Sequence, residues 1–180
     1  MKFEKTSIPG LTLIHPKVWK DERGLFWESY TEAQFKDNSL TTNFVQDNES
    51  ISKKGVVRGL HLQLPPCAQA KLLKVSFGSI LDVCVDLRKG SPSYGEHYSV
   101  VLSSANRRML YIPEGLAHGF LSLEGASHLR YKCSNPYSKT HEVGIIWNDA
   151  DLNINWGTTN PTVSPKDKEG IKFKDFDSPF

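Results

Sequence analysis

Cysteine is scarce in this sequence, and the three that occur, Cys67, Cys84 and Cys133, are widely spaced with no C-x-x-C pair. An odd number at such spacing argues against a disulfide framework and a zinc knuckle, so we expect buried free thiols. No stretch approaches the ~20 apolar residues of a membrane span, and the N-terminus MKFEKTSIPG lacks the apolar core of a secretory signal. These absences predict a cytoplasmic protein that does not contact a membrane.

An excess of charge of one sign is also missing. The sequence has 22 Lys and Arg against 20 Asp and Glu, and its longest basic runs are the pairs at 53–54 and 107–108. A nucleic-acid-binding surface usually needs many clustered cations, so we expect no nucleic-acid partner. A few well-placed cations would instead hold any anionic ligand, which favours a small molecule.

The main pattern in the sequence is an alternation of apolar and polar residues, which is typical of β-strands. It runs through 71–87, 98–103, 107–115, 117–123, 127–133 and 143–149, with turn residues between these segments. Helix signals are weak and limited to 31–39 and 149–154, and 156–180 is expected to be an irregular tail wrapped on the barrel. The length of 180 residues predicts one domain, 1–180, built as a β-sandwich or barrel.

One stretch, RGLHLQLPPCAQAKLLKV, is typical of two strands around a Pro-Pro turn. It carries polar groups where a core strand is apolar: Arg58, His61, Gln63 and Lys71. In later strands, alternation puts His118 on one face with Phe120 and turns Tyr131 inward. An inward polar group without a partner costs about 1–3 kcal/mol, and a single one is most often a satisfied core residue. Several from separate strands indicate a ligand cavity inside the barrel.

The order of motifs along the chain resembles that of the dTDP-4-dehydrorhamnose 3,5-epimerases. The matching runs cover nearly the whole chain and are RGLHLQ, KLLKV, DVCVDLRKGSPSYG, IPEGLAHGF, YKC, WND and SPKD. The resemblance implies an all-β, cupin-like jelly-roll β-barrel with short peripheral helices, and a homodimer. It also implies conversion of dTDP-4-dehydro-6-deoxy-D-glucose to dTDP-4-dehydro-L-rhamnose, by proton removal and return at C3 and C5, without metal or cofactor.

The resemblance assigns catalytic roles to four residues. His61 matches the base and Asp167 the carboxylate that orients it, while Lys71 matches the cation that stabilises the enolate at O4. Removing a weakly acidic proton beside a ketone requires such a base and such a positive charge. Tyr131 matches the acid, because inversion requires the proton to return on the opposite face of the sugar.

Further positions match substrate contacts of the family. The segment DERGLFWE, 21–28, resembles the one that the family lends to the neighbouring subunit, where Arg23 would grip the diphosphate together with Arg58. Phe26 and Tyr137 are expected to stack on the base. The remaining contacts implied by the resemblance are Glu28, Gln46, Asn48, Gln63, His118, Glu142 and Lys166.

Two departures from the family pattern leave alternatives open. Leu62 stands where the family commonly has an aromatic residue, and Pro136 replaces the first of a Tyr-Tyr pair. Relatives with the same base and acid act at C3 alone or on other nucleotide 4-keto sugars, which is the main alternative. A metal-dependent cupin would need an H-x-H pair, and the chain has none. A catalytically silent sugar-nucleotide-binding protein would be expected to lack the base or the acid.

Overall fold

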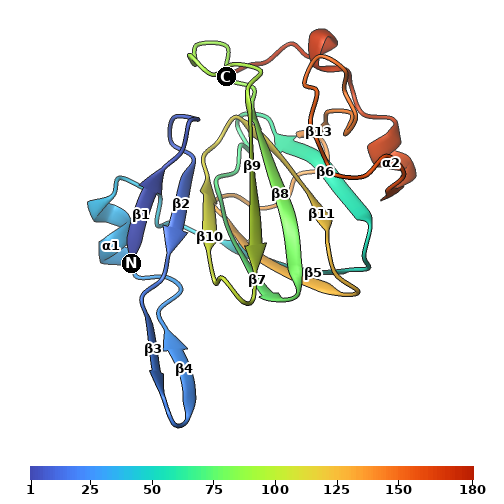
Figure 1. The fold of residues 1–180 in the computed structure, drawn as a ribbon. Coiled ribbons are helices and arrows are strands. Elements are labelled where there is room, and N and C mark those ends of the chain that lie inside the picture. The colour runs from blue at the N-terminus through green and yellow to red at the C-terminus, as the bar shows by residue number, and fades with distance from the viewer.

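The computed structural model describes residues 1–180, and most of its regular structure is antiparallel strand in two facing sheets (Figure 1). The first sheet has the order β1 (Lys2–Lys5), β2 (Thr12–His15), β10 (Met109–Ile112), β7 (Lys71–Phe77), β12 (Ser127–Cys133), β5 (Gln46–Ser52). The second has the order β13 (Glu142–Gly144), β6 (Val56–Gln63), β11 (Leu116–Ser122), β8 (Ser79–Asp86), β9 (His97–Ser103), with β14 (Thr162–Val163) parallel to β6. The predicted all-β, two-sheet architecture is confirmed.

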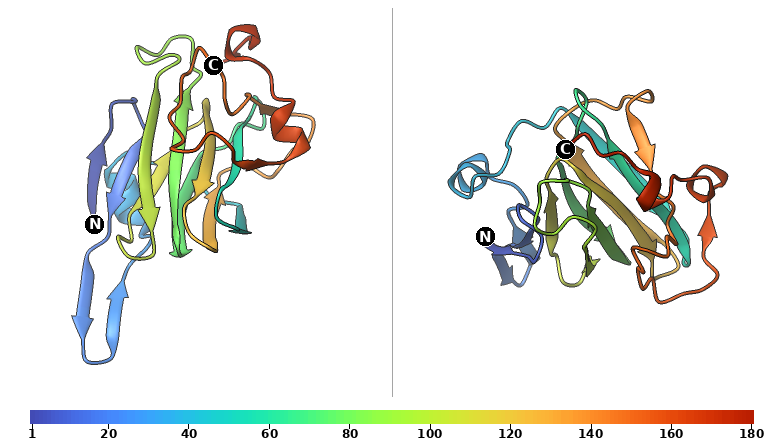
Figure 2. Two further views of the ribbon diagram at one scale, coloured as in Figure 1. Left: turned by 45° about the vertical axis from the view of Figure 1, so that its right-hand side comes forward. Right: turned by 90° about the horizontal axis from the view of Figure 1, so that it is seen from above.

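Three apolar clusters follow from the alternation along these strands. The largest fills the space between the sheets and includes Leu73 of β7, Cys84 of β8 and Phe120 of β11. Residues on the opposite face of the second sheet, such as Leu62, pack against the C-terminal segment. The outer face of the first sheet packs against α1 (Glu32–Asp37) and the residues around it. Figure 2 shows the C-terminal tail and the N-terminal segments on opposite sides of the two sheets.

The helices differ in part from the sequence prediction. The helix expected within 31–39 is confirmed as α1, but the one expected at 149–154 is wrong. There, the Asp149 carboxylate accepts hydrogen bonds from the amides of Asp151 and Leu152 at 2.9 and 3.2 Å, and Asn153 has a φ of 46°. Capping of this kind is typical of a helix start, and the Asn153 amide donates to the Asp149 carbonyl at 3.1 Å. The left-handed backbone of Asn153 then ends the segment after a single turn.

The tail from residue 156 wraps on the second sheet, as predicted, and is more regular than expected. Trp156 and Phe176 are buried against the sheet, and the tail contains β14, α2 (Pro165–Lys168) and the short 3₁₀ helix η1 (Phe173–Asp175). Ser164 caps α2 by accepting a hydrogen bond from the amide of Asp167 at 3.1 Å, and Pro165 occupies the first helical position. This cap fixes the position of Asp167. None of the helices has the length and apolar character that a membrane crossing requires.

A hairpin formed by β3 (Val18–Asp21) and β4 (Gly24–Trp27) projects from the body (Figure 1); we call residues 18–28 the arm. Its surface is apolar and uncovered, with Phe26 68% exposed and Trp19 44% exposed. At its base, the Arg107 guanidinium lies 5.4 Å from the ring centroid of Trp27. An exposed apolar patch of this kind marks an interaction surface.

Candidate active site

A bulge in β6 brings two predicted site residues to the same face. His118 of β11 lies opposite His61, and Phe120 lies opposite Arg58, so one residue of β11 faces two of β6. The bulge depends on Gly59, whose φ is +117° and where a Cβ would lie only 2.5 Å from the Cα of Gly119. Arg58 and His61 are three positions apart and would otherwise lie on opposite faces of the strand.

The shared face opens on a cavity of about 540 Å³ between the sheets. The second sheet contributes Arg58, His61 and His118, and the first sheet contributes Lys71 and Tyr131. Asp167 and Lys166 of α2 also line the cavity. The structure therefore brings together all four predicted catalytic residues, and the inward orientation predicted for Tyr131 is confirmed.

His61 and Asp167 form a hydrogen-bonded pair at the cavity wall. The distance from His61 Nε2 to Asp167 Oδ1 is 2.6 Å, and the amide of Gly59 donates to Asp167 Oδ2 at 3.3 Å. Burial favours a raised pKa for Asp167, but the hydrogen bond and charge of His61, together with Gly59 and Ser164, outweigh it and hold the pKa below its ordinary value. The anionic carboxylate fixes the imidazole, which remains 29% exposed to the cavity side.

A second histidine–carboxylate pair lies in the second sheet. The sequence prediction included its histidine, His118, but not its carboxylate, Asp82. His118 Nε2 is 2.8 Å from Asp82 Oδ2, and Asp82 is fully buried. Asp82 shares the inner face of β8 with Ile80 and Cys84, both members of the apolar cluster between the sheets. A carboxylate in such a strand needs a partner, so this alternation was the signal that pointed to it. No group of three or more His, Cys, Asp or Glu side chains forms a metal-binding cluster.

Lys71 is a buried cation at the cavity wall. Its ammonium forms no hydrogen bond with the protein, and its cross-strand neighbour on β12 is Cys133. Burial lowers the pKa of Lys71, and the nearby Cys133, Cys84, Glu142 and Asp82 oppose this effect only in part. A cation left without a protein partner beside a cavity is suited to bind an anionic oxygen of a ligand.

Tyr131 faces His61 from the other sheet. It lines the same cavity, and its cross-strand neighbour on β5 is Asn48. Burial raises the pKa of Tyr131 above the ordinary value for a phenol, so the side chain carries its proton at neutral pH. A neutral acid and a histidine thus approach the cavity from two opposite walls.

The inner face of β5 adds two serines that the sequence prediction did not include. Ser52 accepts a hydrogen bond from Arg58 Nε at 3.0 Å, which orients the guanidinium. Ser50 lines the cavity, and its buried hydroxyl oxygen has no hydrogen-bond partner. Both lie on the same face of β5 as the predicted residues Gln46 and Asn48, because they follow at steps of two. This alternation could have predicted them.

A smaller cavity of about 120 Å³ adjoins the first and shares His61, Lys71 and Tyr131 with it. The predicted contacts Gln46, Asn48, Gln63, Tyr137 and Glu142 line it. The Tyr137 hydroxyl and the Lys166 ammonium both donate to Glu142 Oε2, at 2.7 and 2.5 Å. Most of the remaining predicted contacts thus lie next to the catalytic residues.

Gln63 holds a loop in place with both ends of its amide. Its nitrogen donates to the carbonyls of Cys67 and Pro136 at 2.6 and 3.2 Å, and its oxygen accepts from the amide of Ser138 at 2.7 Å. Tyr137 lies between Pro136 and Ser138, and is 54% exposed. In this structure Gln63 therefore positions the Tyr137 loop at the mouth of the smaller cavity.

The predicted contacts on the arm lie away from the cavities that contain His61. Arg23 and Phe26 are exposed, and Glu28 follows β4 on the same projecting segment. Arg23 forms an ion pair with Asp21 of its own arm at 2.6 Å. None of the three lines the cavities that contain His61, so the chain does not bring its own arm to this site.

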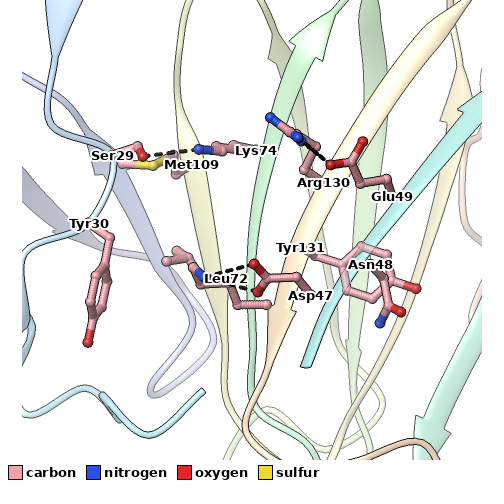
Figure 3. Close-up of a pocket in the computed structure, with 11 residues that line it drawn as sticks. Ser29, Tyr30, Asp47, Asn48, Glu49, Leu72, Lys74, Met109, Arg130 and Tyr131 are labelled. Carbon is pink, nitrogen blue, oxygen red and sulfur yellow. Dashed lines mark hydrogen bonds and ion pairs between the residues drawn. The ribbon is translucent and has the colours of Figure 1, made fainter. Parts of the chain in front are cut away.

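A groove of about 210 Å³ lies on the outer face of the first sheet (Figure 3). Arg130 there pairs with Glu49, and Lys132 pairs with Asp47 at 2.9 Å. The Lys74 ammonium donates to the Ser29 hydroxyl at 3.0 Å. These partners confirm that Arg130 and Lys132 take the face opposite to Tyr131. Arg130 and Lys132 are thus paired with carboxylates, and Lys74 is held by a neutral hydroxyl. Each cation of the groove has a hydrogen-bond partner in the protein, unlike Lys71 in the inner cavity.

Comparisons with a family model, with curated relatives and with solved structures all indicate the same family. The family model for dTDP-4-dehydrorhamnose 3,5-epimerase matches residues 5–175. A curated relative with that name from Shigella flexneri is 48% identical over 178 residues, which cover 98% of each chain.

Solved structures agree over the same length. The crystal structure of dTDP-4-dehydrorhamnose 3,5-epimerase from Elizabethkingia anophelis superposes with a TM-score of 0.94 at 43% identity, covering 97% of each chain. The dTDP-6-deoxy-D-glucose-3,5-epimerase from Legionella pneumophila, in complex with dTDP-4-keto-L-rhamnose, has a TM-score of 0.93 at 40% identity, covering 98% of this chain and 94% of that one. A 3'-monoepimerase from Streptomyces bikiniensis, in complex with dTDP-quinovose, has a TM-score of 0.89 at 31% identity, covering 94% and 87%.

Proposed function

The chain belongs to the dTDP-4-dehydrorhamnose 3,5-epimerase family, and from this membership we propose that its cavity inverts C3 and C5 of a dTDP-4-keto-6-deoxyhexose. The enzyme is an isomerase with the cupin-like jelly-roll fold of that family. Its substrate is dTDP-4-dehydro-6-deoxy-D-glucose and its product is dTDP-4-dehydro-L-rhamnose, which serves dTDP-L-rhamnose or related deoxysugar synthesis. The observation that carries the proposal is a histidine–carboxylate pair and a buried tyrosine on opposite walls of one cavity, with an unpaired lysine between the same sheets.

Proton removal begins at His61. The C4 ketone acidifies the protons on C3 and C5, and the imidazole takes one of them while Asp167 holds the ring through Nε2. The electron pair of the broken C–H bond moves to O4 and forms an enolate. Lys71 stabilises this oxyanion, because its ammonium has no protein partner and lies in a site of low dielectric.

Proton return comes from Tyr131. The phenol donates its proton to the opposite face of the enolate carbon, which inverts the centre and leaves a phenolate beside an imidazolium. The raised pKa of Tyr131 makes the phenolate a strong base, so it regains a proton from solvent, while the His61 imidazolium releases its proton to solvent. Both groups are thereby restored before the second inversion. Repeating the sequence at the second carbon completes the double epimerisation.

The nucleotide part of the substrate is held by charged and aromatic groups around the mouth. Arg58, braced by Ser52, grips the diphosphate, and Lys166 adds a second cation. Tyr137 offers a ring for stacking on the base, and Gln46, Asn48 and Glu142 supply polar contacts. His118 lines the cavity that holds the sugar, together with Lys71, and Asp82 orients its ring.

The site is completed by a second copy of the chain. The arm carries Arg23, Phe26 and Glu28 away from its own cavity and leaves its apolar surface uncovered. A homodimer in which each arm enters the partner's cavity accounts for both facts. The dimer and the cytoplasmic location predicted from the sequence stay part of this proposal.

Product stereochemistry tests the function. Purified protein is incubated with dTDP-4-keto-6-deoxy-D-glucose, and the product is identified by the proton couplings of its ring. We expect inversion at C3 and C5, and no product with His61→Ala. Inversion at C3 alone would instead identify the activity found in the name of the Streptomyces bikiniensis relative. An unchanged substrate would contradict both.

A further inference from the structure

The Ser50 hydroxyl is a polar group that the proposed mechanism does not use. Its oxygen is buried and has no hydrogen-bond partner, although the residue lines the 540 Å³ cavity. An unpaired buried hydroxyl is unfavourable, and rotation about the single χ1 bond lets the oxygen turn toward a group bound in the cavity. A ligand in the cavity can supply the partner that the protein itself does not give.

The position of Ser50 along β5 indicates which part of the substrate it meets. On the inner face of the strand, Asn48 lies opposite Tyr131, and Ser52 holds Arg58. Ser50 lies between these two levels, opposite Leu129. The face thus runs from the acid, past Ser50, to the cation assigned to the diphosphate.

The substrate has the same order of groups. C3 is a reacting carbon, the diphosphate is attached through C1, and C2 with its hydroxyl lies between them. With C3 at the level of Tyr131 and the diphosphate at Arg58, the C2 hydroxyl is the polar group beside β5. A hydroxyl both donates and accepts, so it satisfies the serine whichever way the Ser50 proton points.

From this geometry, and resting on the proposed function, we infer that Ser50 binds the C2 hydroxyl of the sugar and sets the position of C3 against Tyr131. Ser50 is then a specificity residue for the sugar and not a contact of the nucleotide. The substrate thus supplies the hydrogen-bond partner that no protein group gives to this hydroxyl.

A cycle of two changes tests this inference: Ser50→Ala in the protein, and the 2-deoxy analogue in place of the substrate. With the normal substrate, we expect Ser50→Ala to lower kcat/KM about tenfold, the fold-change of one neutral hydrogen bond. With the 2-deoxy analogue, Ser50→Ala is expected to change nothing further, because the partner is already absent. Ser50→Thr keeps a hydroxyl and is expected to retain most of the discrimination between the two substrates.

Binding of dTDP alone provides the control. It lacks the sugar, so its dissociation constant is expected to be the same for Ser50→Ala and the wild type, and thermal unfolding shows whether the variant folds. The assignment to C2 would be overturned if Ser50→Ala lowered kcat/KM equally with both substrates, or if it raised the dissociation constant of dTDP. Failure of the wild type to epimerise the normal substrate would instead contradict the proposed function itself.

Discussion

Burial shifts the pKa values of the two groups that face His61 from the first sheet in opposite directions. It lowers the pKa of Lys71, since the ammonium loses hydration, and raises the pKa of Tyr131, since the phenolate would lose it. Both shifts favour the neutral form. The mechanism needs Tyr131 neutral and Lys71 charged, so the lysine is the group whose protonation limits activity at high pH.

We therefore predict that the alkaline limb of kcat falls below the pKa of about 10.4 of an exposed lysine. As pH rises through the lowered pKa of Lys71, the enolate loses its cation, while Tyr131 still holds its proton. Lys71→Arg, which stays charged throughout, is expected to be slower at neutral pH and to lose this limb. A limb at the same pH in both proteins, measured by initial rates, would assign it to another group.

Sequence and structure agree unevenly at the scale of single residues. Alternation alone gave the inward orientation of Tyr131 and His118, because period two holds along uninterrupted strands. It could not give the shared face of Arg58 and His61, since that depends on a bulge at Gly59. Alternation along β8 marks Asp82 as a buried carboxylate that needs a partner, but it does not identify His118, because the pairing spans two strands.

At the scale of elements, the connection after β8 is held by one buried carboxylate. Asp86 is fully buried and accepts hydrogen bonds from the guanidinium and amide of Arg88 and from the hydroxyls of Ser91 and Ser93. Burial opposes its ionisation, but these donors outweigh that effect and lower the pKa of Asp86 to about 2. The connection therefore depends on the charge of Asp86.

The sign of the pH dependence follows from the lowered pKa. An unfolded aspartate has a pKa of about 3.9, so Asp86 contributes stability fully above that value and loses it as pH falls toward 2. We predict that Asp86→Asn lowers the free energy of unfolding by about 2 kcal/mol at pH 7, and that the difference from wild type vanishes near pH 2. Urea unfolding across this range is the measurement.

Asp177→Asn serves as the matched control for this element. Asp177 also pairs with a basic side chain, Lys89, but its own side chain is 93% exposed. An exposed ion pair contributes little to stability, so no measurable change is expected. A loss in Asp86→Asn that is no larger than in this control would show that the connection does not depend on the buried charge.

Secondary-structure elements could be predicted where a local sequence pattern determines them. The strands β11 and β12 follow the alternation in 117–123 and 127–133, and α1 falls within 31–39. The turn at 149–154 was mistaken for a helix, because Asp149 does cap the segment as at a helix start. The left-handed backbone of Asn153, which ends it after one turn, is not visible in the sequence pattern. The four-residue α2 was missed for a related reason, since its order comes from Ser164 and the sheet beneath it.

At the scale of the whole molecule, the arm is the segment on which the proposed dimer depends. Its exposed aromatic surface and the cation–π contact of Arg107 with Trp27 give a segment that is held at its base and free at its tip. A segment of this kind fits an exchange between two copies of the chain, in which each arm completes the partner's site.

Mixing two inactive variants tests the exchange of arms. One variant carries Arg23→Ala and Phe26→Ala, and the other carries His61→Ala. In a heterodimer, the intact arm of the second chain reaches the intact histidine of the first, so one site of two works. Co-expression with different tags is expected to restore about a quarter of wild-type turnover, because random pairing makes about half of the dimers mixed. No recovery in purified heterodimers would show that each arm serves its own chain.

The most direct test of the central claim, an acid and a base on opposite walls of one cavity, is the incorporation of solvent deuterium. The enzyme is incubated with dTDP-4-keto-6-deoxy-D-glucose in deuterated water after chelator treatment, and proton NMR follows C3 and C5. The account predicts deuterium at both carbons in the inverted product, none with His61→Ala, and exchange with little inversion with Tyr131→Phe. Near-normal turnover by His61→Ala, or full inversion by Tyr131→Phe, would contradict it.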